Sequence, residues 1–116
     1  MTLFLGRHSP QRGAGQPINV GERGLGHVLA RHFPGGAQTA GKSLFSAGET
    51  VPGLVRGAEG VAPVLQRGGN FQRVVEAGRA IGVNRATGLP TTTYIVITDA
   101  AGNLIEVRVR QLGACL

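Results

Sequence analysis

Apolar side chains recur at helical spacing near the start of the chain. Within residues 20–33 they fall at intervals of three and four, as the buried face of an amphipathic helix requires: Leu25, Val28, Leu29 and Phe33. A Pro-Gly-Gly run follows at residues 34–36 and ends the pattern. We therefore predict one helix over residues 20–33, preceded by a linker or poorly ordered lead-in over residues 1–19.

The middle of the chain shows shorter patterns. Residues 34–43 are rich in glycine and predict a loop, and residues 44–60 predict a short helix with Thr50 as its N-cap and Pro52 in its first turn. The remaining pieces are two short apolar segments that suit strands and one turn: residues 61–65, 71–77 and 84–90.

The C-terminal third alternates with the period of a β-strand. Residues 91–98 are rich in β-branched side chains, residues 99–103 have the chemistry of a hairpin loop, and residues 104–110 alternate strictly. In the second strand we expect three residues to face inward and three outward: Ile105, Val107 and Val109 against Glu106, Arg108 and Arg110. A helix followed by antiparallel strands predicts an α+β fold, with the N-terminal helix packed on a twisted antiparallel sheet and residues 20–116 forming one domain.

Composition narrows the class of protein. The 116 residues suffice for one small domain, and 20 glycines with six prolines predict that it is rich in loops. The single cysteine, Cys115, excludes an internal disulfide and a zinc site built from several thiolates. No apolar run reaches membrane-spanning length, and no signal peptide is visible.

The charge balance points to an anionic partner. The formal net charge is +6, and eleven of the twelve basic residues are arginine, which suits bidentate contact with phosphate. Nucleic acid, an acidic protein and a membrane surface are the possible partners. Because no basic amphipathic helix is present in the sequence, we expect no membrane binding.

Residues 36–43 match the full P-loop pattern that binds nucleotide phosphates. That pattern needs a strand before it and a helix after it. Here a predicted helix and Pro34 precede it, and Gly48 and Pro52 interrupt the segment after it. A doubly wound parallel sheet also does not fit 116 residues that end in a hairpin, so nucleotide binding at Lys42 is the weakest alternative.

Two histidines on the predicted helix suit acid–base catalysis near neutral pH. His32 falls on the apolar stripe, while His27 falls on the opposite side between Arg23 and Arg31. Both also fit simpler roles, His32 as a satisfied core histidine and His27 as a solvated surface residue. Their spacing suits no zinc site, so we predict no metal and no cofactor.

Three further residues complete a possible catalytic group. Lys42, the only lysine, offers a compact cation for a developing phosphate charge, although it also fits a plain surface role. Thr92 and Tyr94 share one face of their predicted strand and suit phosphate or base contact, although both types favour strands in any case. We expect that face to point away from the core and the other face to point toward it: Thr93, Ile95 and Ile97.

These groups are the ones that metal-independent RNA cleavage needs. A base takes the proton of the 2′-hydroxyl, an acid protonates the leaving oxygen, and a cation with hydroxyl donors holds the phosphate. The predicted catalytic residues are His27, His32, Lys42, Thr92 and Tyr94. The predicted substrate-binding residues are Arg31, Ser43 and Arg108.

Four short motifs, in order, resemble those of a known family. They are Gly-His-x-x-x-Arg-His-Phe at residues 26–33, Gly-Lys-Ser-x-Phe at 41–45, Ile-Gly at 81–82, and Thr-x-Tyr-x-Val-Ile-Thr-Asp-x-x-Gly-Asn-Leu-Ile at 92–105. The chain resembles the C-terminal toxin domains of bacterial polymorphic and contact-dependent growth-inhibition systems, and most closely the ribonucleases of the barnase/EndoU/colicin/RelE-like (BECR-like) superfamily.

The resemblance implies a metal-independent endoribonuclease toxin that cleaves RNA, commonly tRNA, to a 2′,3′-cyclic phosphate and a 5′-hydroxyl. It implies that His27 or His32 takes the place of the family's helix histidine, with Lys42 as the phosphate-binding cation. The loop that holds a second histidine in EndoU-type enzymes holds Lys42 here, which leaves the acid unassigned.

The resemblance also implies a setting for this activity. The domain would be secreted as part of a larger effector, act in the cytoplasm of a target cell, and bind an acidic immunity protein as a monomer or 1:1 complex. A non-catalytic nucleic-acid-binding module remains an alternative, which the sparse aromatic residues weaken.

Overall fold

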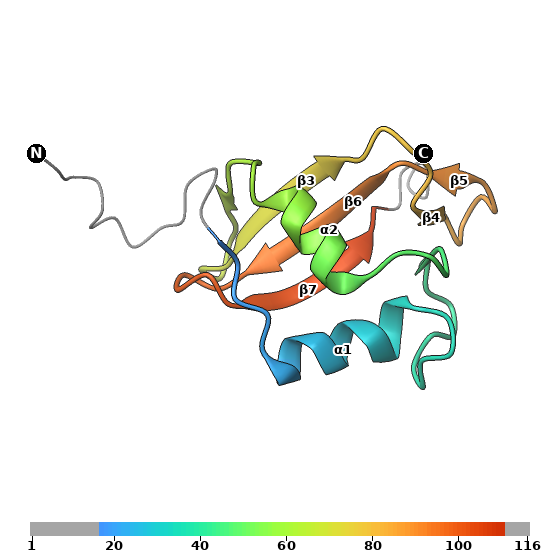
Figure 1. The fold of residues 1–116 in the computed structure, drawn as a ribbon, viewed down its shortest axis with the longest axis horizontal. Helices are drawn as coiled ribbons and strands as arrows, with labels where there is room; N and C mark the ends of the chain where they lie inside the picture. The colour runs from blue at the N-terminus through green and yellow to red at the C-terminus, as the bar shows by residue number, and fades with distance from the viewer. Residues whose placement is uncertain (1–16, 111–116) are drawn as a thin grey trace, which may run out of the picture.

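The computed structural model describes residues 17–110 and has an α+β fold, as the sequence predicts. Most of the predicted lead-in, residues 1–16, lies outside the described residues. The elements in chain order are α1 (Glu22–His32), β1 (Leu44–Phe45), α2 (Val51–Ala58), β2 (Val64–Leu65), β3 (Phe71–Glu76), β4 (Gly82–Val83), β5 (Pro90–Thr91), β6 (Thr93–Thr98) and β7 (Leu104–Val109) (Figure 1).

The strands form two antiparallel sheets. The larger sheet has the order β2-β3-β6-β7, and its three long strands pair over most of their length. The smaller sheet joins three two-residue strands in the order β1-β4-β5. The predicted hairpin over residues 99–103 is confirmed, because it joins β6 to β7.

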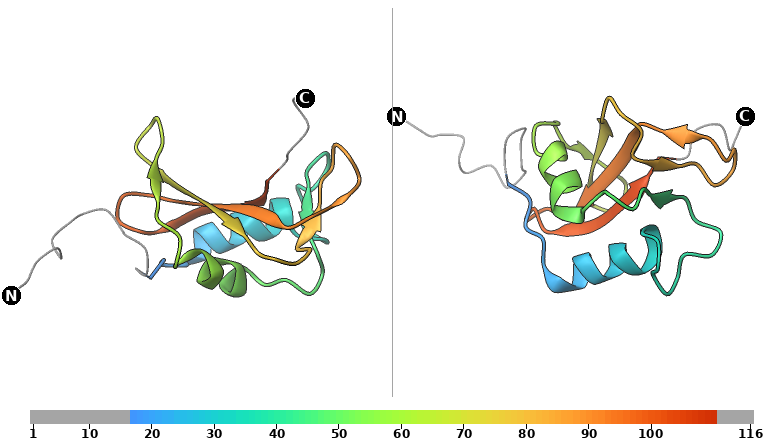
Figure 2. Two further views of the ribbon diagram at one scale, coloured as in Figure 1. Left: turned by 90° about the horizontal axis from the view of Figure 1, so that it is seen from above. Right: turned by 45° about the vertical axis from the view of Figure 1, so that its right-hand side comes forward.

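The two helices hold different places against the larger sheet. In Figure 1, α2 crosses in front of the sheet, while α1 runs alongside its edge strand β7. In the left view of Figure 2, the turn between β2 and β3 and the turn between β4 and β5 rise on the side away from the helices. Because α1 packs along β7, its side chains lie next to the strand that carries Glu106.

Glycine at two positions lets α1 lie close to its neighbours. A Cβ at Gly24 would come within 2.5 Å of the carbonyl oxygen of Leu104, so only glycine allows this approach of α1 to β7. A Cβ at Gly36 would come within 2.3 Å of the carbonyl oxygen of Leu29 and would open the turn after the helix. The close approach of Gly24 to Leu104 fixes the position of α1 along β7.

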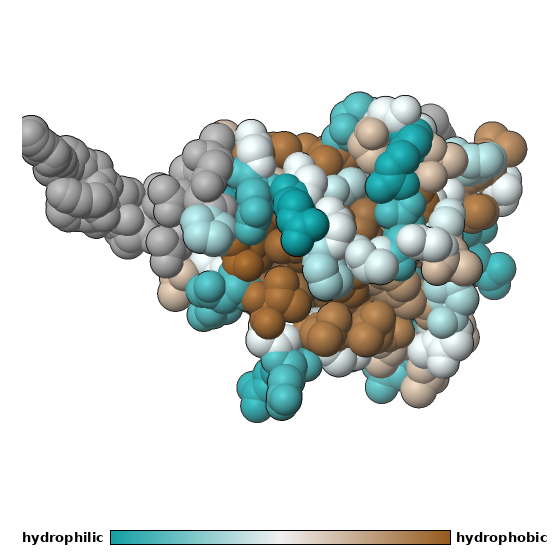
Figure 3. All heavy atoms as spheres, in the orientation of Figure 1, coloured by the Kyte–Doolittle hydropathy of each residue, from teal (hydrophilic) through white to brown (hydrophobic). Residues whose placement is uncertain are grey.

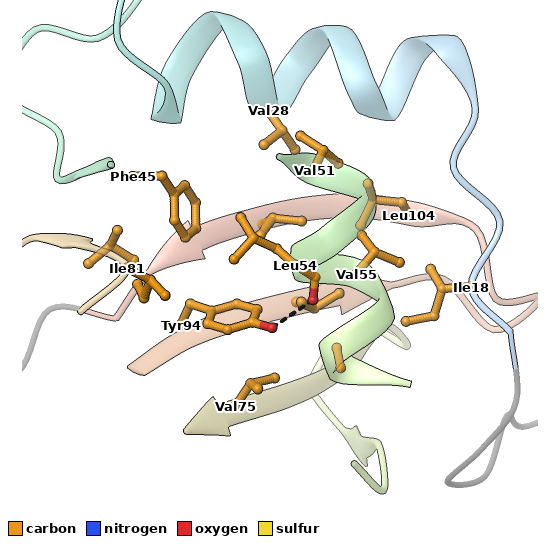
Figure 4. Close-up of a cluster of buried hydrophobic side chains, with 14 of the residues drawn as sticks. Ile18, Val28, Phe45, Val51, Leu54, Val55, Val75, Ile81, Tyr94 and Leu104 are labelled. Atoms are coloured by element: carbon orange, nitrogen blue, oxygen red, sulfur yellow. Dashed lines mark hydrogen bonds between the residues drawn. The ribbon is translucent and has the colours of Figure 1, made fainter. Parts of the chain in front are cut away.

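Helix α2 begins as predicted. The hydroxyl of Thr50 accepts a hydrogen bond from the backbone N–H of Gly53 at 3.1 Å, and Pro52 lies in the first turn. Its buried residues reach the core that Figure 4 shows between α2 and the sheet: Val51, Leu54, Val55 and Ala58.

The core faces of β6 and β7 differ from the expectation. On β6, Tyr94 and Val96 belong to the core cluster and Thr98 is buried, so the prediction that Thr93, Ile95 and Ile97 form the core face was wrong, although Ile95 is also buried on the other face. Both faces of this strand bear apolar side chains, and alternation alone does not distinguish them. On β7 the inward positions of Val107 and Val109 are confirmed, whereas Ile105 is 36% exposed.

A β-bulge explains the outward position of Ile105. Thr98 pairs with Leu104, but the preceding Ile97 pairs with Glu106, so the ladder skips Ile105. The extra residue keeps both Leu104 and Val107 in the core, although they are three positions apart. Strict alternation from the sequence therefore fails at one position.

The segment before α1 belongs to the packed fold. Ile18 is a core residue, and its N–H donates to the Glu59 carboxylate at 2.9 Å. Asn19 bridges to Asn103, accepting from the N–H of Leu104 at 2.8 Å and donating to the carbonyl of Gly102 at 2.9 Å. These residues lie within the lead-in expected over residues 1–19, so the packed part of the chain starts earlier than residue 20.

A buried arginine lies beneath the same end of the sheet. The Arg73 side chain is fully buried, and it donates from Nε to the Val61 carbonyl at 2.9 Å and from Nη1 toward the Thr98 hydroxyl at 3.5 Å. Burial lowers the pKa of Arg73, and the charge of Glu59 opposes that shift. Glu59 therefore serves two partners, this arginine and the N–H of Ile18.

Figure 3 shows apolar side chains gathered at the surface between α1 and α2. Leu25 packs partly against the core, and Leu29, one turn further along α1, is 43% exposed. The apolar stripe predicted for the helix thus turns partly to solvent. No helix within residues 17–110 is long and apolar enough to cross a membrane.

Candidate active site

Glu106 on β7 holds both helix histidines. Its Oε2 accepts a hydrogen bond from Nε2 of His32 at 3.1 Å, and its Oε1 lies 3.2 Å from Nε2 of His27. The two residues lie five apart on α1, so their side chains diverge around the helix and rise about 7.5 Å along it. One carboxylate bridges that gap because α1 packs along β7 at this height.

The carboxylate of Glu106 stays ionised in this setting. Burial tends to raise the pKa of Glu106, but the hydrogen bond from His32 and the positive charges of His32 and His27 outweigh burial and lower it. An ionised carboxylate accepts only, so Nε2 of His32 carries the proton of their hydrogen bond. When His32 is neutral, that tautomer leaves its Nδ1 as the nitrogen able to accept a proton. In His27, Nε2 is the nitrogen next to the carboxylate, which leaves Nδ1 for a substrate.

The two histidines differ in access to solvent. The side chain of His27 is 31% exposed, whereas that of His32 is 9% exposed. Nδ1 of His32 is buried and has no hydrogen-bond partner among residues 17–110. His27 is therefore the histidine that a substrate can reach, and His32 anchors the carboxylate behind it.

His27 also lines a hollow of about 520 Å³ between the start of α1 and the β6–β7 hairpin. Arg23 stands one turn before His27 on the same helix and shares this lining. The remaining wall comes from the segment before α1 and from the hairpin: Asn19, Val20, Gly21, Gly24, Asp99, Asn103, Leu104 and Ile105. A partly exposed histidine, held by a carboxylate and next to an arginine, thus opens onto a cavity of ligand size.

Lys42 and Ser43 belong to a second cluster. Lys42 and Arg85 line a separate hollow of about 360 Å³, in which no histidine takes part. Ser43 is buried, and its hydroxyl accepts a hydrogen bond from the backbone N–H of Arg85 at 2.7 Å. This bond fixes the loop after β4 and places Ser43 in a structural role.

The same cluster bears on the P-loop pattern at residues 36–43. Helix α1 precedes the pattern and strand β1 follows it, which reverses the strand–loop–helix order that a P-loop needs. The hydroxyl that would bind a metal in such a loop is the buried one of Ser43. The topology agrees with the argument against nucleotide binding made from the sequence.

The predicted Thr92–Tyr94 pair does not form a shared surface. Tyr94 is buried in the core, where its hydroxyl donates to the Leu54 carbonyl at 2.7 Å (Figure 4). Burial raises the pKa of Tyr94, so its phenol stays neutral. Thr92 lies between β5 and β6 and donates to the Glu76 carboxylate at 3.0 Å. Both residues were expected to face away from the core beside the histidines, and neither contacts them within the described residues.

Several cations near the site lack a carboxylate partner. Within residues 17–110, Arg79 with Glu49 is the one arginine–carboxylate ion pair at contact distance. Arg31 donates to the neutral side chain of Gln38 at 3.0 Å, and Arg108 lies on β7 two residues after Glu106. Three of the cations without a carboxylate partner line a hollow, Arg23 beside His27 and Lys42 with Arg85 in the second hollow. Neither Arg31 nor Arg108, both predicted to bind substrate, lines one of these two hollows.

Sequence reasoning missed the residue that joins the site. Glu106 was expected only as an outward-facing strand residue, and its role depends on a helix packing contact between distant parts of the chain. The sequence held one signal: among the charged residues of the predicted strand 104–110, Glu106 is the only acidic one, and the others are Arg108 and Arg110. No group of three or more histidine, cysteine, aspartate or glutamate side chains that could hold a metal occurs within residues 17–110.

Comparisons with protein-family models, with curated proteins and with solved structures give no significant match to this chain. The geometry of Glu106, His27 and the adjoining hollow therefore carries the functional argument.

Proposed function

We propose that this chain is an endoribonuclease toxin domain that cleaves RNA without a metal ion. The observation that carries the proposal is the partly exposed His27, paired with the ionised Glu106 and facing a hollow that Arg23 also lines. A base oriented by a carboxylate, with a cation beside it, is the arrangement that acid–base catalysis on a phosphodiester needs.

The proposed reaction starts with proton transfer from the substrate's 2′-hydroxyl to Nδ1 of His27. The 2′ oxygen then attacks the adjacent phosphorus, and the bond from phosphorus to the 5′ oxygen breaks. That oxygen takes a proton from solvent, giving a 2′,3′-cyclic phosphate and a 5′-hydroxyl. Glu106 stabilises the protonated His27, and Arg23 offsets the charge that develops on the phosphate oxygens.

The biological setting of the proposal comes from the family resemblance and the charge. We take tRNA as the substrate and an acidic immunity protein as the partner that covers the basic surface. The net charge of +6 and the unpaired arginines support both. The domain would reach the cytoplasm of a target cell as part of a larger secreted effector.

Incubation of the purified protein with total tRNA in EDTA tests the proposal. We expect discrete fragments ending in a 2′,3′-cyclic phosphate, and at least a hundredfold slower cleavage by His27→Ala, since general base catalysis contributes about 10²–10⁴-fold. Thr92→Ala is the matched control, because Thr92 bonds Glu76 away from the histidines. Full cleavage by His27→Ala would refute the assignment.

Glu106 is a positioning residue in this scheme, and its variant has its own signature. Glu106→Gln keeps the shape of the side chain but removes the negative charge 3.2 Å from Nε2 of His27. We expect Glu106→Gln to lower kcat for RNA cleavage at least tenfold and to change KM less than twofold, because the carboxylate acts on His27 and does not contact the RNA. An unchanged kcat, or equal changes in kcat and in the free energy of unfolding, would assign Glu106 a purely structural role.

A nucleic-acid-binding module without catalysis is the second candidate function. The cations without carboxylate partners favour it equally, because they supply phosphate contacts whether or not cleavage follows. This candidate predicts RNA affinity that falls steeply with salt, together with intact tRNA after prolonged incubation.

A further inference from the structure

The hollow beside His27 has a composition that the proposed cleavage does not by itself require. Val20, Leu104 and Ile105 give it apolar walls, and Asn19 and Asn103 contribute polar groups from the segment before α1 and the hairpin. Its volume of about 520 Å³ lies in the range of pockets that bind small organic ligands. A phosphate alone would need neither the volume nor the apolar surface.

Two apolar side chains in this hollow are left open to solvent. Val20 is 38% exposed and Ile105 is 36% exposed, and neither belongs to the core cluster. The β-bulge at Ile97 and Thr98 is what turns Ile105 outward. Bulges are common next to active sites because they redirect a side chain, and here the redirected side chain lines the hollow.

The hairpin wall of the hollow is held rigid by its own hydrogen bonds. Asp99 accepts from the N–H groups of Ala101 and Asn103 at 2.9 Å and from the Asn103 side chain at 3.0 Å. Asn103 in turn accepts from the side chain of Asn19 at 3.1 Å. The hydrogen bonds of Asn103 hold the pKa of Asp99 below its usual range, which keeps this carboxylate ionised as the acceptor of the loop. A preformed wall of this kind selects ligands by shape.

Gly21 leaves part of the helix side of the hollow open, next to the side chains of Arg23 and His27 that line the rest of that side. A Cβ at Gly21 would have no neighbour within 4 Å, so the space beside it is open. No side chain caps α1, whose first turn begins at Glu22, and Gly21 and Gly24 both line the hollow. A flat ligand can therefore approach the backbone at Gly21 while it contacts the apolar wall opposite.

We propose that this hollow binds the base of the RNA nucleotide whose 2′-hydroxyl faces His27. A nucleobase presents flat apolar faces to Val20 and Ile105 and polar edges to the asparagines. The phosphate of the same nucleotide would contact Arg23. The inference rests on the proposed function, because it takes His27 as the base. It adds that cleavage depends on which base occupies the hollow.

Titration with nucleotides tests the hollow apart from catalysis. The probes are adenosine, cytidine, guanosine and uridine 3′-monophosphates, with inorganic phosphate at equal ionic strength, and the readout is the NMR shifts of the Gly21, Gly24 and Asn103 amides. We expect saturable shifts with at least one nucleotide, and a dissociation constant for phosphate at least tenfold larger than the one for that nucleotide. Equal shifts from phosphate alone would overturn the base pocket and leave an anion site.

A matched pair of variants locates the binding. Ile105→Glu and Val74→Glu make the same charge change at strand residues that are each 36% exposed, but only Ile105 lines the hollow. We expect Ile105→Glu to weaken nucleotide binding at least tenfold and Val74→Glu less than threefold, with thermal unfolding verifying that both fold. Equal losses in the two variants would place the nucleotide elsewhere.

Sequencing of cleavage sites separates failure of this inference from failure of the proposed function. If the hollow selects the base, wild-type cleavage favours one base before the cut, and Ile105→Glu broadens that preference. Cleavage with no base preference in the wild type refutes the pocket and leaves the ribonuclease proposal standing. Nucleotide binding without any RNA cleavage refutes the ribonuclease proposal and retains the pocket.

Discussion

Tyr94→Phe distinguishes a core tyrosine from a catalytic one. The substitution keeps the ring, and with it the edge-on contact with Phe45, whose ring centroid lies 6.1 Å away. It removes only the hydroxyl and its 2.7 Å hydrogen bond to the Leu54 carbonyl. A buried hydrogen bond of this type contributes about 0.5–1.5 kcal/mol to the free energy of unfolding.

The expected consequence is a less stable protein with intact chemistry. A loss of about 1 kcal/mol lowers the Tm of a domain this size by roughly 4–8 °C. Thermal unfolding followed by circular dichroism measures this shift, and tRNA cleavage is assayed well below either Tm. We expect equal cleavage rates for Tyr94→Phe and the wild type at that temperature. An unchanged Tm together with lost cleavage would refute the argument and return Tyr94 to the active site.

Alkaline pH offers an independent check on Tyr94. Burial raises the pKa of Tyr94 in the folded state, so the unfolded chain loses the phenol proton first as pH increases. The stabilisation from this residue is thus fully present below about pH 10, the ordinary tyrosine pKa, and is lost as pH rises through the folded pKa. Wild-type stability should therefore fall relative to Tyr94→Phe above about pH 10. Parallel stability curves for the two proteins would contradict burial of the phenol.

Three further predictions concern α1, Glu106 and α2. Gly24→Ala should cost about 1–3 kcal/mol in urea unfolding, because its Cβ would lie 2.5 Å from the Leu104 carbonyl oxygen. Gly26→Ala, with nothing within 4 Å of the new Cβ, should instead stabilise by about 0.5–1 kcal/mol, and equal effects would contradict the packing of α1. The interactions with the histidines lower the pKa of Glu106 in the folded state. The stabilisation from Glu106 is therefore fully present above the ordinary glutamate pKa and is lost as pH falls through the folded-state pKa. In Glu106→Gln the free energy of unfolding should fall less steeply over that acidic range, and an unchanged slope would refute the pairing. Thr50→Ala should cost about 1 kcal/mol in urea unfolding through loss of the N-cap, and Thr50→Ser should restore most of it.

Local patterns predicted the elements that local chemistry determines. The apolar spacing and the Pro-Gly-Gly run predicted a helix over residues 20–33, and the structure has α1 at Glu22–His32. The cap at Thr50 is set by contacts within four residues, and the β6–β7 hairpin by contacts within its own loop. None of these needs information from distant parts of the chain.

The facing of the strands was harder to predict because it depends on partners elsewhere in the chain. Residues 93–98 present apolar side chains on both faces, and the choice between them is made by α2, whose Leu54 carbonyl and Gly57 leave room for the Tyr94 ring and hydroxyl. That choice removed Tyr94 from the predicted site. Lys42 and Arg85 also line a different hollow from His27, and the order of loops in the sequence does not reveal which hollow each cation lines.

The β-bulge in β7 connects the fold to the candidate site. Under strict alternation, Leu104 and Glu106 would share a face, so either a leucine would leave the core or a carboxylate would enter it. The skipped position at Ile105 resolves that conflict, because Leu104 and Val107 both stay buried while Glu106 turns to α1. The same step turns Ile105 into the hollow beside His27. One inserted residue thus sets the carboxylate that orients His27 and the apolar wall proposed to contact the base.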